Sequence, residues 1–350
     1  MYPDKEVRKV EIGKRKLRIL SVIVETYVET GEPVGSKTVC NLLDFPISSA
    51  TVRNEMSELV ELGLLEQPHT SAGRIPSQLG YRVYLNHLEQ SRQISEYEKN
   101  LINDVLWDSA DDPEHLIEAA AKVLAKITNF TSIITTPPED EARVRDVQFV
   151  QTGRRSAMIV LMTSTGMVKN RLFRCNYDIS PVLLKIFREV LNEKLSDKLL
   201  TSLKSELMNM VVQTDSEIAL LMSPVIKAVM ETAREACQVN IRMGGRNNLL
   251  ILPDFKAENI VNILDFLDSK ENILKLLLEK ERGVNIFIGE ETNCLALENS
   301  SIVVTRYSIG GRSGAIGVIG PTRMDYSGLI TKVEYVAYMV EKLLNKILDI

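Results

Sequence analysis

A polar stretch that begins at residue 48 carries the side chains with the most usable chemistry in this sequence. Arg can form two hydrogen bonds to guanine, Asn can do the same for adenine, and Ser or Thr hydroxyls bind bases or phosphates. The stretch opens a predicted helix, whose N–H groups also favour phosphate. We therefore interpret these residues as contacts to DNA, the alternative being that Ser48 only caps the helix and the others are solvated. They are Ser48, Ser49, Thr51, Arg53 and Asn54.

Two neighbouring groups extend this polar surface. The turn-rich segment 68–74 is predicted to form a wing-like loop that offers His69, Ser71 and Arg74 to DNA, with Arg74 in a minor groove or on a phosphate. The alternative is a surface turn with one charged residue. Ser36 and Lys37 stand at the start of the preceding short helix, where contacts to the phosphate backbone are common.

Charge gives only local support to a nucleic-acid partner. The net charge is −5, so the whole chain is not basic. A basic cluster near the N-terminus could contact phosphates, or could be a solvated helix start. Within it, Arg15 and Lys16 are weaker candidates for DNA contact than the residues above. The cluster consists of Arg8, Lys9, Lys14, Arg15, Lys16 and Arg18.

No catalytic or metal-binding pattern stands out, and we predict no enzyme, no cofactor and no metal. The three histidines, at 69, 87 and 115, have no carboxylate or cysteine at ligand spacing, and the four cysteines lie far apart. The glycines between 310 and 320 lack the Gly-Lys-Ser/Thr ending of a phosphate loop, so a tight hairpin is the better interpretation. Since no long apolar run or secretory signal is present, we expect a cytoplasmic protein without a membrane partner.

Helical spacing and turn residues predict the elements that position the candidate site. We expect an N-terminal order of helix, helix, turn, helix and hairpin. The helices are predicted over Lys14–Thr30, Ser36–Leu43 with Ser36 as N-cap, Ser48–Glu61, and Ser77–Arg92. Strands are predicted at Leu64–Gln67 and around Ile75-Pro76.

The remaining chain is predicted to be α+β. Helix is expected through most of 93–140 before a strand at Thr131–Thr136, and a three-stranded antiparallel meander follows over 144–173. Residues 179–239 are predicted as helices that start at Ser180-Pro181 and Ser223-Pro224, with a break at Gly244-Gly245. Further elements are a helix over 258–281, strands at 284–288, 301–308 and 315–319, and a closing helix from Tyr326 to Ile350.

Two long strings of residues resemble the HrcA family of bacterial heat-inducible transcription repressors. One runs through EPVGSKTV at 32–39 and SSATVRNEMSELVELGLLEQPHTSAGRIPSQLGYRVYL at 48–85. The other comprises IGE at 288–290 and GVIGPTRMDYS at 317–327. Because the strings lie near both ends of the sequence, the resemblance covers essentially the whole chain.

The resemblance implies a winged helix-turn-helix over 1–92, a GAF-like domain over 93–140 and 246–350, and an inserted dimerisation domain over 141–245. It further implies a homodimer that represses chaperone operons by binding an inverted-repeat operator in double-stranded DNA, and that depends on the GroEL chaperonin. Apolar residues of the inserted segment could form the dimer contact or that domain's own core: Leu183, Ile186, Phe187, Val190 and Leu191. For 320–326 we weigh a local Arg323–Asp325 pair against a dimer or chaperonin contact. The alternative function is a ligand-sensing, GAF-type regulator of other genes.

Overall fold

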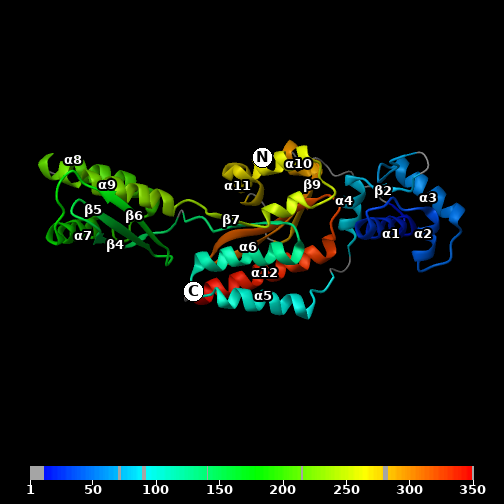
Figure 1. Cartoon of the computed structure of the whole chain (residues 1–350), viewed down its shortest axis with the longest axis horizontal. Coiled ribbons are helices and arrows are strands. Elements are labelled where there is room, and N and C mark those ends of the chain that lie inside the picture. The colour runs from blue at the N-terminus through cyan, green and yellow to red at the C-terminus, as the bar shows by residue number, and fades with distance from the viewer. Residues whose placement is uncertain are drawn as a thin grey trace. The chain divides into compact units, whose positions relative to one another are not determined.

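The computed structural model describes residues 12–69, 72–88, 92–139, 141–213, 216–278 and 283–348, and it mixes helices with sheets (Figure 1). The chain divides into two compact units. Unit 1 comprises 1–135, 241–307 and 315–344, and unit 2 comprises 136–240, 308–314 and 345–350. The α+β expectation is confirmed.

Three helices open unit 1: α1 (Lys14–Thr30), α2 (Ser36–Leu42) and α3 (Ser49–Glu61). Gly31 ends α1 in the left-handed conformation, with φ 73°, as expected of a glycine at this position. Ser48 caps α3 as predicted. The predicted cap at Ser36 is wrong, because Gly35 precedes the helix and Ser36 is its first residue.

Two short strands and a fourth helix follow. The strands β1 (Leu65–Glu66) and β2 (Ile75–Pro76) pair antiparallel, and Ser77 caps α4 (Gln78–Asn86) by accepting from the Gly80 N–H. The helix was predicted to reach Arg92 but ends at Asn86. Residues 92–95 are not helical, and Ser95 opens the next helix with a capping box.

A five-stranded sheet forms the centre of unit 1, in the order β7-β3-β10-β9-β8. Its strands are β3 (Thr131–Thr135), β7 (Ile241–Gly244), β8 (Asn285–Ile288), β9 (Ser300–Ile309) and β10 (Arg312–Pro321). The hairpin predicted for the glycine-rich segment is confirmed, since Gly310 and Gly311 turn between β9 and β10 with φ of 52° and 83°. Strand β7 was missed because Gly244 was interpreted as a break. A Cβ there would lie 2.3 Å from the Ala121 carbonyl oxygen, so glycine permits close packing.

Helices cover both faces of this sheet (Figure 1). On one face lie α6 (Pro113–Thr128) and α12 (Tyr326–Ile347), with α5 (Glu96–Asp108) packed outside them. On the other face α10 (Ala257–Asp268) and α11 (Lys270–Leu278) share a core with apolar strand residues. The single helices predicted over 93–128 and 258–281 are therefore each two helices, separated at 109–112 and at Ser269.

Unit 2 is built on the predicted meander of β4 (Val144–Gln151), β5 (Ser156–Thr163) and β6 (Val168–Arg174). Helix α7 (Pro181–Leu195) packs on β4, and α9 (Ser216–Ala236) packs on β6, next to α8 (Leu203–Gln213). The predicted helix start at Ser223-Pro224 is wrong, because Pro224 lies inside α9. Of the apolar residues weighed as a dimer contact, Phe187 and Leu191 belong to the core of unit 2, whereas Ile186 is 49% exposed.

Candidate nucleic-acid interface

The start of α3 brings the predicted hydroxyl residues together. The Ser48 hydroxyl accepts from the Thr51 N–H at 3.1 Å and lies 2.8 Å from the Thr51 hydroxyl. The Ser49 hydroxyl lies 3.2 Å from that of Ser36, at the start of α2. The Ser48–Thr51 bonds fix the start of α3, and the Ser36–Ser49 contact joins it to the start of α2.

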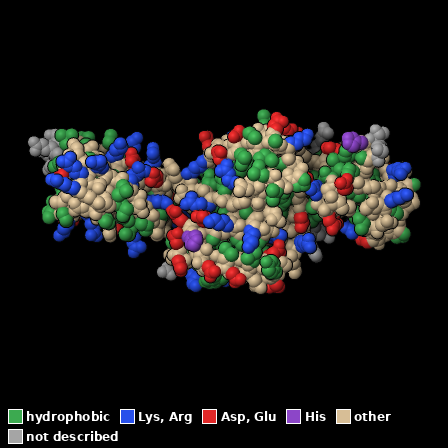
Figure 2. All heavy atoms as spheres, in the orientation of Figure 1, with side chains coloured by type: hydrophobic (Ala, Val, Ile, Leu, Met, Phe, Trp, Pro, Cys, Tyr) green, Lys and Arg blue, Asp and Glu red, His purple; other side chains and the backbone are tan. Residues whose placement is uncertain are grey.

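Three longer polar side chains project from the same region. Arg53 and Asn54 are exposed on α3, and Lys37 is exposed on α2. None of the three has a side-chain partner among the residues that the structure describes. Lys and Arg side chains are visible over this part of the molecule (Figure 2). The predicted long polar residues are therefore uncommitted and accessible.

A buried carboxylate that the sequence analysis missed fixes α3 from behind. Glu55 is 3% exposed and pairs with Arg15 and Lys16 of α1. Burial by itself raises the pKa of Glu55, but the hydrogen bonds from Arg15 and Lys16 outweigh it, and the pKa is lowered. The two cations thus hold α3 in place, which leaves less of their charge for DNA than the sequence suggested.

The other predicted contacts belong to the loop 67–74, between β1 and β2, and they differ in exposure. His69 is exposed, whereas Ser71 lies outside the described residues. Arg74 pairs through its backbone with Val34, and its side chain turns back toward the carbonyls of Ala72 and Gly73, at 3.4 Å each. Arg74 therefore stands at the base of the loop.

Gly73 explains why the loop can lie so close to the segment before α2. A Cβ at Gly73 would lie 2.5 Å from the backbone of Val34. The φ of Gly73 is not in the positive range, so the position requires glycine for space and not for backbone freedom.

Arg323 joins the N-terminal helices to the rest of unit 1. Its guanidinium donates to both carboxylate oxygens of Asp254, at 2.7 and 3.0 Å, and to the Val28 carbonyl of α1 at 3.0 Å. It also lies 6.0 Å from the Tyr27 ring centroid. The local pair with Asp325, one of the two alternatives weighed for this segment, is not formed. Asp325 instead accepts from the Gly328 N–H and lies near Arg92.

Helix α4 makes a second junction. Arg82 donates to the Ile286 carbonyl at 2.6 Å and forms a two-pronged ion pair with Glu291. Gln78 donates to the Glu298 carbonyl at 3.0 Å and accepts from the Glu290 N–H at 3.2 Å. The IGE string at 288–290 thus contacts the helix that follows β2, a role that no local sequence signal indicated.

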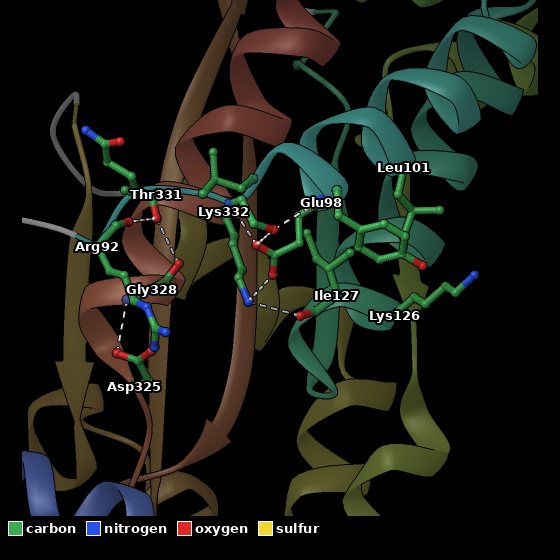
Figure 3. Close-up of a pocket in the computed structure, with 13 residues that line it drawn as sticks. Arg92, Glu98, Leu101, Lys126, Ile127, Asp325, Gly328, Thr331 and Lys332 are labelled. Carbon is green, nitrogen blue, oxygen red and sulfur yellow. Dashed lines mark hydrogen bonds and ion pairs between the residues drawn. The ribbon is translucent and has the colours of Figure 1, made fainter.

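The segment after α4 is hydrogen-bonded to α12 through Arg92 (Figure 3). The Arg92 N–H donates to Ser327 at 2.7 Å, and Thr331 donates to the Arg92 carbonyl at 2.8 Å. Beside them, Lys332 pairs with Glu98 at 2.7 Å. Burial raises the pKa of Glu98, but hydrogen bonds from Lys332 and Ser95 lower it to about 2. These polar groups line a cavity of about 640 Å³ but largely satisfy one another.

The described residues contain no group of three or more His, Cys, Asp or Glu side chains that could hold a metal. None of their helices is long and apolar enough to cross a membrane.

Comparisons with known proteins agree along nearly the full length. The chain is 34% identical over 344 residues to the heat-inducible transcription repressor HrcA of Ruminiclostridium cellulolyticum, which covers 97% of this chain and 99% of the relative. It is 33% identical over 333 residues to the protein of the same name from Halalkalibacterium halodurans, covering 95% and 97%. A crystal structure of a hypothetical protein matches with a TM-score of 0.69 at 22% identity, over 96% of this chain and 100% of that one, which shows a shared fold.

These findings define a transcription repressor and not an enzyme. The family model for the HrcA protein C terminal domain matches residues 114–330. The chain belongs to the HrcA family of heat-inducible transcription repressors, and the resemblance noted in the sequence is confirmed.

Proposed function

We propose that residues 1–92 act as a winged helix-turn-helix that reads DNA with α3. In this proposal α2 and α3 are the two helices of the motif, and the loop 67–74 is the wing. The observation that carries it is the pair Arg53 and Asn54 in the amino-terminal half of α3, both exposed and without side-chain partners among the described residues. Both residue types can bind a base with two hydrogen bonds.

The remaining proposed contacts are assigned to phosphate or to the loop according to where their side chains lie. Lys37 is exposed beside α3 and is proposed to bind phosphate, together with Ser36 and the hydroxyls at the α3 start. His69 and Ser71 are proposed to reach DNA from the loop. The Arg74 side chain points toward the carbonyls of its own loop, so it would have to change rotamer to reach DNA. Contact residues are thus Ser36, Lys37, Ser48, Ser49, Thr51, Arg53, Asn54, His69, Ser71 and Arg74.

The repressor is further proposed to act as a homodimer on an inverted-repeat operator of chaperone operons. Residues 93–140 and 246–350 would form a GAF-like domain, and 141–245 an inserted dimerisation domain. A two-fold dimer presents two copies of α3, which matches the symmetry of an inverted repeat. By analogy with the family, the GroEL chaperonin would keep the dimer active. Operator binding that is unchanged by added GroEL would argue against this last element.

Two substitutions separate base contacts from phosphate contacts. Arg53→Ala should weaken operator binding by about 1–3 kcal/mol and leave binding to scrambled DNA nearly unchanged. Lys37→Ala should weaken both DNAs similarly and reduce the salt dependence. Affinities would be measured by mobility shift at fixed salt, with Lys122→Ala on α6, whose side chain is 67% exposed, as a control for loss of one positive charge.

The base contact of Arg53 and the phosphate contact of Lys37 would be contradicted by different results. If Arg53→Ala binds both DNAs as the parent does, α3 does not read bases through this side chain. If Lys37→Ala loses affinity for the operator alone, Lys37 is not a phosphate contact.

A further inference from the structure

Arg323, between β10 and α12, fixes the carboxy-terminal end of α1. Its guanidinium donates to the Val28 carbonyl at 3.0 Å, while its other two nitrogens hold Asp254. Val28 lies in the last turn of α1, where carbonyls have no partner within the helix and favour a positive charge. Gly31 leaves room for this contact, since a Cβ there would lie 3.3 Å from the guanidinium. Arg323 therefore sets the position of this end of α1.

Arg82 makes the corresponding contact from α4. It donates to the Ile286 carbonyl at 2.6 Å and to both carboxylate oxygens of Glu291. Glu291 also accepts from the Ile288 N–H at 2.9 Å, so the acceptor is itself held in place. A two-pronged pair between arginine and carboxylate fixes orientation as well as distance. Together the two arginines define how the N-terminal helices are oriented on the rest of unit 1.

Close packing contributes less to this orientation, because the junction contains open space. A cavity of about 690 Å³ lies between the N-terminal segment and α10, with Tyr27 and Tyr81 among its lining residues. A second cavity, of about 420 Å³, lies between α1 and the segment before α12 and is lined by Tyr326. The rings of Tyr81 and Tyr326 meet edge-on, so this apolar contact has a cavity on each side. The directional bonds of the arginines therefore decide the angle of the N-terminal helices.

The proposed DNA-reading helix α3 moves with α1. Arg15 and Lys16, near the start of α1, pair with Glu55 of α3. Val28, where Arg323 binds, is about 18 Å along the helix from Lys16, at about 1.5 Å per residue. A tilt of about 10° at Arg323 would thus displace α3 by about 3 Å, close to the rise of one base pair, about 3.4 Å. A small change at the arginine becomes a change of one base pair at the DNA.

We propose that Arg323 and Arg82 are positioning residues that set the half-site spacing accepted by the repressor. The inference rests on the proposed dimer, which reads an inverted repeat with two copies of α3. One base pair inserted between the half-sites moves them about 3.4 Å apart and rotates them by about 35° relative to each other. N-terminal helices held at a fixed angle cannot follow this change, whereas helices released from the arginines can. Since neither arginine contacts DNA in this proposal, base preference within a half-site should not depend on them.

The test is a mobility shift of the full-length protein at fixed salt on the operator, on operators with one base pair more or fewer between the half-sites, and on a single half-site. The parent should lose about tenfold or more in affinity when the spacing changes, because both copies of α3 no longer bind together. The double variant Arg82→Ala/Arg323→Ala should lose about threefold or less. Its half-site affinity should equal that of the parent, which also shows that its N-terminal helices remain folded.

Arg246→Ala is the matched control. It removes an arginine of unit 1 that pairs with Asp268 of α10, and it should discriminate spacing as the parent does. The inference is overturned if the double variant discriminates spacing as strongly as the parent. It is also overturned if half-site affinity falls together with operator affinity, as a misfolded N-terminal segment would show. A parent that binds the operator no better than scrambled DNA would overturn the proposed function, and this inference with it.

Discussion

Replacing Arg323 and its two acidic neighbours one at a time and in pairs tests how the N-terminal helices are held. The Arg323 and Asp254 side chains are 20% and 21% exposed and form a two-pronged pair. Two unit charges 4 Å apart near a protein surface interact by about 4 kcal/mol, whereas exposed pairs contribute about 0.2–1 kcal/mol. For a largely buried pair with this geometry we expect a coupling of about 2 kcal/mol between Arg323→Ala and Asp254→Ala.

The same cycle with Asp325 is the control. Asp325 is two residues from Arg323 but does not pair with it in the structure, so the coupling between Arg323→Ala and Asp325→Ala should stay within about 0.5 kcal/mol. Urea unfolding followed by tryptophan fluorescence suits the measurement. The only tryptophan, Trp107, lies in α5 and therefore reports on unit 1. A coupling to Asp325 that equals or exceeds the coupling to Asp254 would refute the assigned pairing.

Three further perturbations test the supports of the candidate site. Glu98, with a folded pKa of about 2, stabilises the fold above its unfolded pKa, near 4.3. This stability is lost as the pH falls toward 2, so urea midpoints between pH 5 and 2 should fall less in Glu98→Gln than in the parent. Gly73→Ala should lower the free energy of unfolding by about 1–3 kcal/mol, because the added Cβ meets the Val34 backbone, and so should lower the thermal midpoint. An unchanged midpoint would contradict the close approach. Glu55→Gln should cost about 2 kcal/mol in urea, less than a fully buried pair because Arg15 is more than half exposed, and a neutral effect would contradict its anchoring role.

The elements that the sequence predicted well are those with a local signal. Apolar spacing and a terminal glycine located α1, and a serine cap located the start of α3. The meander of unit 2 was found because strand-like runs alternate with clear turns. In each case the residues that decide the structure are neighbours in the chain.

The errors arose where tertiary contacts override a local signal. Gly244 resembles a breaker but lies in a strand, because it lets β7 approach α6. Pro224 resembles a helix start but is accommodated inside α9. The partner of Arg323 is 69 residues away in the sequence, so the local pair with Asp325 could only be weighed as one of two alternatives.

The candidate contact residues were predicted from their chemistry, but the buried ion pairs that hold α3 in place were not. Arg53 and Asn54 follow from residue type and helix position. Glu55 lies between buried positions of the same helix and resembles a solvated charge until α1 is placed against it. A periodic pattern with one carboxylate on the apolar face was the only signal that could have indicated this anchor.

The most direct test of the account is a mobility shift of the full-length protein on three DNAs at fixed salt. They are the inverted-repeat operator, a scrambled sequence, and the operator with five base pairs inserted between its half-sites. The account predicts that the operator is bound about a thousandfold or more tightly than scrambled DNA. The insertion, about half a helical turn, should abolish most of that preference. Equal binding to all three DNAs would contradict sequence reading by a dimer through α3.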